Sequence, residues 1–161
     1  MYTTNRELTE NDRYSMLVAI SLYGGTASSR LFKNVREKQS LCYYCSASFN
    51  WFTSSLTVDS GVEHENVENL INATRKELSD LIDGEITNEE LNEVKLTIKN
   101  GLITNYDSLH GLEAWYLNEI LRNSNKTPEE VIDLVSAVKI NDIKEILKTL
   151  HLNVIYTISK K

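Results

Sequence analysis

Hydrophobic residues recur at helical spacing along most of this 161-residue chain. In residues 65–83, apolar side chains fall every three or four positions, which places them on one helix face, and Gly84 follows as a stop. Thr9 and Thr87 each precede an acidic residue by three positions, a spacing typical of a capping box at a helix start. The helices predicted in this way span residues 9–25, 28–38, 65–83, 87–105 and 108–123, and two more begin at Thr127 and Asn141.

The same periodicity predicts which side chains of residues 108–123 face the core. Apolar residues recur there on one helix face, so we expect that face to be buried. Its members are Leu109, Leu112, Trp115, Tyr116 and Ile120.

Three segments have strand character. Residues 54–62 alternate between apolar and polar, residues 41–49 are rich in Tyr, Cys, Ser and Phe, and residues 153–159 close the chain. The turn at 50–53 joins the first two strands as a hairpin. The aromatic rings around it are either core at the end of the sheet, which we favour, or a small binding surface. These rings are Phe49, Trp51 and Phe52.

The order of elements predicts an α+β fold, an antiparallel sheet covered by helices on one face. Three strands are few for so many amphipathic helices. Either residues 2–8 add a short edge strand or the missing strand lies outside this chain. If the sheet edge stays open, two chains could pair across it as a homodimer.

Composition is that of one ordinary globular domain over residues 1–161, with 41% hydrophobic and 25% charged residues. The net charge of -6 argues against nucleic acid as a partner, since phosphate binding needs clustered cations. No apolar run approaches the length of a membrane span, and no secretory leader opens the sequence.

Two cysteines form a C-x-x-C pattern, which can indicate a zinc knuckle or a redox pair. We read Cys42 and Cys45 as buried free thiols, because three residues along a strand would put them on opposite faces. Reduced thiols without a leader predict a cytoplasmic protein.

The three histidines do not assemble a metal motif. His110 begins an H-x-x-E-H pattern, but Ala114 stands where the second histidine is needed. A catalytic zinc needs three protein ligands. We therefore expect no zinc or other cofactor to be held by this chain.

The most informative stretch is 24–44, GGTASSRLFKNVREKQSLCYY. Gly24 and Gly25 are expected to end the first helix, because glycine tolerates a left-handed cap. Arg36 ends the next helix, and Tyr43 follows seven residues later. A guanidinium can donate to carbonyls and a phenol to a developing oxyanion, although Arg36 could equally pair with an acid and Tyr43 could be core.

This stretch resembles the C-terminal, non-zinc half of the insulinase, pitrilysin and mitochondrial-processing-peptidase family of zinc metallopeptidases, nearest its bacterial members. Looser similarity extends over nearly the whole chain. The resemblance implies the α+β half-domain of those enzymes, excised from a longer peptidase. The residues in register with the family pattern are Gly24, Gly25, Ser28, Ser29, Arg30, Leu31, Phe32, Val35, Arg36, Glu37, Lys38, Leu41 and Tyr43.

In that family the N-terminal domain holds zinc and closes with the C-terminal domain over an extended peptide. By resemblance, Arg36 and Tyr43 are auxiliary catalytic residues that contact the peptide backbone and oxyanion, and Gly24, Gly25 and Ser29 help bind substrate. The partner would be an N-terminal zinc-bearing domain or subunit. The alternative is a non-catalytic subunit or scaffold of the same fold, pairing with a separate zinc-bearing chain.

Overall fold

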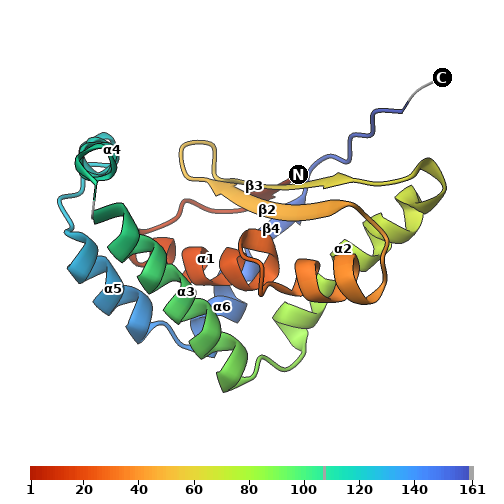
Figure 1. The fold of residues 1–161 in the computed structure, drawn as a ribbon, viewed down its shortest axis with the longest axis horizontal. Helices are drawn as coiled ribbons and strands as arrows, with labels where there is room; N and C mark the ends of the chain where they lie inside the picture. The colour runs from red at the N-terminus through yellow and green to blue at the C-terminus, as the bar shows by residue number, and fades with distance from the viewer. Residues whose placement is uncertain (107, 160–161) are drawn as a thin grey trace.

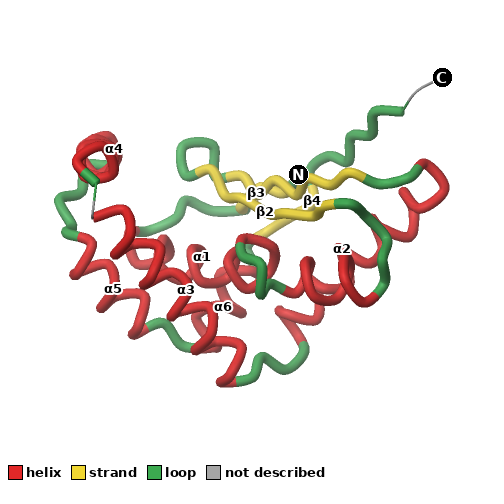
Figure 2. Tube along the Cα trace, viewed as in Figure 1, coloured by secondary structure: helices red, strands yellow, loops and turns green. Residues whose placement is uncertain are grey.

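The computed structural model describes residues 1–106 and 108–159. It has the predicted α+β architecture, in which helices cover one face of an antiparallel four-stranded sheet (Figures 1 and 2). The strands are β1 (Tyr2–Thr4), β2 (Tyr44–Asn50), β3 (Ser55–Gly61) and β4 (Leu150–Leu152). The α-helices are α1 (Glu10–Ile20), α2 (Val67–Asp83), α3 (Asn88–Tyr106), α4 (Leu109–Leu121), α5 (Pro128–Ala137) and α6 (Ile140–Leu147). A π-helical turn η1 (Ser21–Gly25), a π-helix η2 (Leu31–Lys38) and a 3-10 turn η3 (His64–Asn66) complete the set.

The N-terminal segment supplies the fourth strand of the sheet. The strand order is β2-β3-β1-β4, so β1 lies inside the sheet and not at its edge. Tyr2 pairs with Leu56 of β3 on one side and with Leu152 of β4 on the other. Of the two alternatives, the strand within residues 2–8 is the one that forms, at Tyr2–Thr4, but its predicted place at the edge is wrong, and β2 and β4 are the edge strands.

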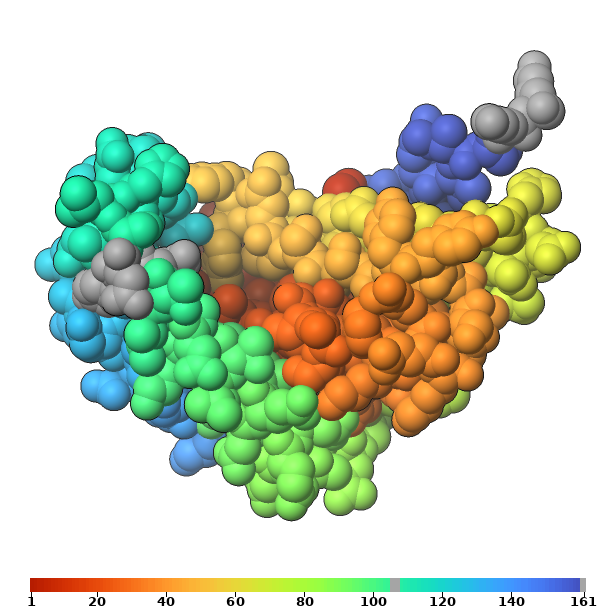
Figure 3. All heavy atoms as spheres, in the orientation of Figure 1, coloured from red at the N-terminus to blue at the C-terminus, as the bar shows by residue number. Residues whose placement is uncertain are grey.

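The prediction of a last strand over residues 153–159 is wrong. The strand is Leu150–Leu152, because β1 offers it partners only at Tyr2, Thr3 and Thr4. The N–H groups of Asn153 and Val154 both donate to the carbonyl of Met1, at 2.9 and 3.3 Å. Beyond that point the described segment runs exposed and away from the body of the molecule (Figure 3).

The first predicted strand begins three residues late, at Tyr44. Ser40 has a positive φ of 51°, and the Leu41 N–H bonds back to the Val35 carbonyl, so the chain is still turning there. Cys42 therefore precedes the strand, and the argument from opposite strand faces does not apply to it. Both thiols are free. Burial, with Cys42 nearby, raises the pKa of Cys45 to about 12, which disfavours the reactive thiolate.

The core lies between the sheet and the helices, with α1 at its centre. Met16, Val18 and Ala19 of α1 are fully buried. From the sheet, Leu56 contributes a fully buried side chain. Tyr23 of η1 is also buried, and its hydroxyl donates a hydrogen bond to the Thr74 carbonyl of α2 at 2.9 Å. The helices around α1 thus form the second layer of the fold.

Helix α4 is buried only in part on the expected face. Ser108 caps it, at the predicted start, but Leu109 is 89% exposed and Ile120 is 70% exposed. Tyr116 is also exposed, whereas Leu112 and Trp115 are half-buried. The side chain that α4 buries is Glu119, because it forms an ion pair with Arg13 of α1. The packed side is thus only one edge of the predicted apolar face, the edge formed by Leu112, Trp115 and Glu119.

The start of α1 makes a first prediction. Thr9 and Asp12 form the predicted capping box, and Arg6 donates two hydrogen bonds to the Asp12 carboxylate, at 2.7 and 2.8 Å. The hydrogen bonds from Arg6 lower the pKa of Asp12 to about 2, although partial burial of the carboxyl group acts in the opposite direction. We expect Asp12→Asn to lower the free energy of unfolding by about 1 kcal/mol at pH 7.

Because the folded pKa lies below the ordinary value of 3.8, the carboxylate stabilises the fold fully above about pH 4. That contribution is lost as the pH falls toward 2. Urea unfolding of wild type and Asp12→Asn at several pH values should therefore show two curves that converge in acid. Glu7→Gln, an exposed neighbour, is the control, and a gap that is independent of pH would contradict this account.

Candidate functional site

The two glycines of the motif differ in role. Gly24 is buried, and a Cβ there would lie 2.7 Å from the Ala47 Cβ and 2.9 Å from the Ala47 backbone nitrogen. Gly25 is exposed. Among the described residues no glycine has a positive φ, so the expected left-handed cap is wrong. Gly24 is explained by the close approach of η1 to β2.

Ser29 is buried, with 1% of its surface exposed. Its hydroxyl accepts a hydrogen bond from the Phe32 N–H, at 3.4 Å, and its carbonyl accepts from the Lys33 N–H, at 2.9 Å. Ser29 thus starts η2 in the manner of a helix cap. Its contact with a peptide stays a prediction, as do those of Gly24 and Gly25.

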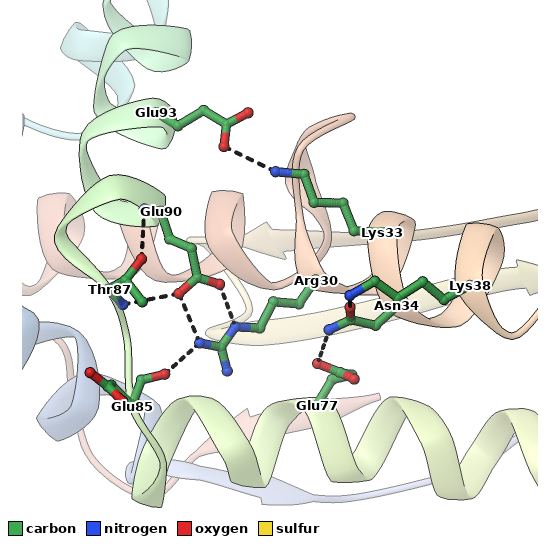
Figure 4. A network of polar contacts seen from close by, with 9 residues as sticks. All are labelled: Arg30, Lys33, Asn34, Lys38, Glu77, Glu85, Thr87, Glu90 and Glu93. Atoms are coloured by element: carbon green, nitrogen blue, oxygen red, sulfur yellow. Dashed lines mark hydrogen bonds and ion pairs between the residues drawn. The ribbon is translucent and has the colours of Figure 1, made fainter.

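Polar contacts hold η2 against α2 and α3 (Figure 4). Arg30 donates to both carboxylate oxygens of Glu90, each at 3.1 Å, and to the Glu85 carbonyl at 2.7 Å. Burial alone would raise the pKa of Glu90, but the bonds from Arg30 and the Thr87 N–H outweigh it and lower that pKa. Asn34 donates to the buried Glu77 at 2.9 Å. This network fixes the helix that carries Arg36.

Arg30 and Arg36 should therefore behave differently on substitution. We expect Arg30→Ala to lower the free energy of unfolding by about 1–2 kcal/mol, since it leaves Glu90 without its forked partner. Arg36→Ala should change it by less than about 0.5 kcal/mol. Thermal melting of both variants checks this. A larger loss for Arg36→Ala would make Arg36 a structural residue.

Arg36 is exposed at the end of η2, and its guanidinium stacks over the Phe32 ring, 4.7 Å from the centroid. In the described parts of the chain, no acidic side chain forms an ion pair with it. The structure therefore does not support the alternative in which Arg36 only forms an ion pair with an acidic residue. Its hydrogen-bond donors remain available to a ligand.

Tyr43 lies just before β2, and its side chain is 65% exposed, so it is not a core residue. Its hydroxyl donates to the Glu63 carboxylate. That hydrogen bond raises the pKa of Tyr43, because the nearby negative charge disfavours a phenolate. Tyr43 is therefore a protonated donor at neutral pH, and it does not contact Arg36 directly among the described interactions.

The uncovered face of the sheet is polar, a feature that the sequence reasoning missed. In β2, exposed Tyr44, Ser46 and Ser48 alternate with buried Cys45 and Ala47. The alternation of small polar residues in 44–50 was the signal that could have found it. This face starts beside Tyr43 and runs the length of β2.

Metal ligands do not gather anywhere in residues 1–106 and 108–159, where no group of three His, Cys, Asp or Glu could hold an ion. His64, His110 and His151 stand on separate elements and are all exposed. No helix in the same described residues is long and apolar enough to cross a membrane.

Comparison with known proteins decides the family. The model of the "Peptidase M16 inactive domain" matches residues 2–98. The chain belongs to the peptidase M16 family. It corresponds to the inactive domain of these zinc proteases, as the resemblance of residues 24–43 predicted, and its M16 fold is the expected half-domain.

One curated relative and two solved structures illustrate the M16 match. YmfF of Bacillus subtilis, named a probable inactive metalloprotease, is 26% identical over 96% of this chain and 36% of its own length. A conserved protein from Enterococcus faecalis has a TM-score of 0.83 at 33% identity, over 92% of this chain and 35% of its own. The "Inactive Peptidase Domain" from Bordetella parapertussis has a TM-score of 0.75 at 11% identity, over 93% of this chain and 86% of its own. The chain spans about a third of the length of the curated relatives it matches.

Proposed function

We propose that this chain is the substrate-binding half of a zinc endopeptidase that acts on extended peptides. The observation that carries the proposal is that Arg36 and Tyr43 are both exposed donors, with a polar open sheet face that starts beside Tyr43. A partner domain or subunit with the H-x-x-E-H motif would hold the zinc, since the described residues here contain no ligand set for it.

Each donor has a distinct proposed role. The planar guanidinium of Arg36 would donate to a peptide carbonyl, a task that its anchored helix supports. The Tyr43 hydroxyl would turn from Glu63 to the oxygen on which negative charge develops during hydrolysis. Its raised pKa keeps the proton on the hydroxyl for that purpose.

The test uses the longer protein that carries both halves. We expect Arg36→Ala and Tyr43→Phe each to lower kcat on a quenched fluorescent peptide by about a hundredfold, with an unchanged melting temperature. Arg75→Ala and Tyr116→Phe, both exposed in this domain, are the matched controls. Wild-type turnover in both test variants would contradict the proposal.

The second candidate is a non-catalytic subunit or scaffold of the same fold. The name given to YmfF, which includes the word inactive, favours it. Two measurements on the longer protein distinguish the two candidates, namely its zinc content and its peptidase activity. Zinc-dependent hydrolysis supports the first, and a folded longer protein without either property supports the second.

A further inference from the structure

A cavity of about 320 Å³ opens at the end of the sheet opposite to Tyr43. The β2–β3 turn, the start of α1 and the segment after α4 meet there (Figures 1 and 3). Its walls differ in character. One is apolar, from Trp51, Phe52 and Leu121, and the other is polar, from Arg13, Arg122 and Ser124. That size is within the range of small-ligand pockets.

The polar wall carries an excess of positive charge. Arg13 donates to Glu119 Oε1 at 2.5 Å, and an Arg122 nitrogen lies 3.7 Å from the same oxygen. Two guanidinium groups thus share one carboxylate, which is 2% exposed. Glu10 also lines the cavity, but Lys126 lies 3.7 Å from it and offsets its charge. Since Glu119 neutralises only one of the two guanidinium groups, one positive charge in this wall remains for a bound anion to balance.

Buried hydrogen-bonding atoms in this wall have no partner among the described residues. Arg122 Nε is one of them. The end of α4 holds this residue in place, since Asn123 has a positive φ of 54° and the Ser124 N–H donates to the Glu119 carbonyl at 2.8 Å. Ser124 Oγ and Glu119 Oε2 are two others, but, against the effect of burial, Ser124 lies close enough to Glu119 to lower the pKa of that carboxyl, so these two atoms face each other. Native proteins pair nearly all buried polar groups, so the unpaired Arg122 Nε indicates a polar ligand beside Arg122.

The apolar wall is open to contact. Phe52 is 67% exposed and Leu121 is 58% exposed. Trp51 is half-buried and packs edge-on against Phe49, with ring centroids 4.9 Å apart. Phe49 and Trp51 are thus largely core, as favoured from the sequence, whereas Phe52 forms the exposed surface that was the alternative. Large exposed apolar side chains beside a cation suit a ligand with both characters.

We propose that this cavity binds the C-terminal residue of a peptide. The terminal carboxylate would lie against Arg122, and an apolar side chain would lie against Phe52 and Leu121. The last residue of a peptide carries a carboxylate and a side chain on the same carbon, which matches a cation beside an apolar surface. A phosphate would leave the apolar wall unused. The proposal does not depend on Arg36 and Tyr43, which lie at the other end of β2, roughly 26 Å of extended chain away.

The experiment is titration calorimetry on the 161-residue chain with an acetylated tetrapeptide that ends in phenylalanine. We expect saturable binding of the free acid and at least tenfold weaker binding of the same peptide as its C-terminal amide. Hexanoate should also bind at least tenfold more weakly, because it lacks the backbone and the ring. Equal binding of acid and amide, or tighter binding of hexanoate, would overturn the proposal.

Three variants locate the binding. Arg122→Gln should weaken it at least tenfold, and Phe52→Ala, which changes an exposed ring and leaves the core intact, about fivefold. Lys76→Gln removes a positive charge at an exposed residue of α2 that does not line the cavity, and it should leave binding within twofold. Melting curves verify that each variant is folded. If Phe52→Ala binds like wild type, or Lys76→Gln matches Arg122→Gln, the ligand does not occupy this cavity.

Discussion

Replacing Arg13 with methionine should lower the free energy of unfolding by about 3 kcal/mol, the largest loss that we expect from a single ion pair here. Arg13 makes the short bond to Glu119, whose side chain is 2% exposed. Methionine keeps the apolar length of the side chain but leaves the carboxylate buried without its main partner. Arg122, at 3.7 Å, compensates only in part.

Chemical denaturation of the chain measures this loss. The double variant Arg13→Met/Glu119→Leu should recover most of the stability, because it removes the stranded charge. Arg6→Met, at an arginine that is 45% exposed, should lose less than about 1 kcal/mol and serves as the control. An Arg13→Met variant as stable as wild type would show that the pair contributes nothing.

The pH dependence gives an independent check. Burial would raise the pKa of Glu119, but Arg13 outweighs it and the pKa is lowered. In wild type, the carboxylate's contribution is present above its ordinary pKa of 4.5 and is lost as the pH falls below it. Without Arg13, burial dominates and the pKa rises, so the variant should gain relative stability in acid. The gap between the two proteins should therefore narrow as the pH falls.

Most helix starts could be predicted from the sequence because capping is local chemistry, although the last helix begins at Ile140 after Lys139 and not with a cap at Asn141. Thr9 with Asp12 and Thr127 with Glu130 form capping boxes through residues only three positions apart. The place of β1 could not be predicted in this way. Its pairing joins Tyr2 to Leu56 and Leu152, and no local pattern in a three-residue strand encodes partners so far along the chain.

The candidate residues could be named from the sequence only because residues 24–43 resemble a family motif. That resemblance singled out Arg36 and Tyr43, both of which are exposed, and their contact with a peptide stays a prediction. Helix α4 was misread because periodicity shows that one face is apolar, but it does not show which face a neighbour covers. The pairing of Glu119 with Arg13 brings together residues 106 positions apart, so the buried charge and the cavity beside it became visible only in three dimensions.

Gly24→Ala should lower the free energy of unfolding by about 3 kcal/mol, the upper end of what overpacking typically costs. The new methyl group would lie 2.7 Å from the Ala47 Cβ, 2.8 Å from Leu31 Cδ1 and 2.9 Å from a backbone nitrogen. The contact with Leu31 could relax by side-chain rotation, but both contacts with Ala47 are fixed by its backbone and require η1 to move away from β2. Helix η2 would move as well, because Leu31 belongs to it.

The neighbouring glycine provides the control. At Gly25 a Cβ would lie 3.1 Å from the Ile20 carbonyl oxygen, a tight contact that a small shift relieves at this exposed residue, so Gly25→Ala should lower the free energy of unfolding by about 1 kcal/mol or less. Adding Ala47→Gly to Gly24→Ala should restore only part of the loss, since the backbone contact persists. Denaturant unfolding of all three variants, without any peptide present, measures the contribution of packing alone. If Gly24→Ala proves as stable as wild type, close packing does not explain this glycine, and a role in contacting peptide becomes the better account.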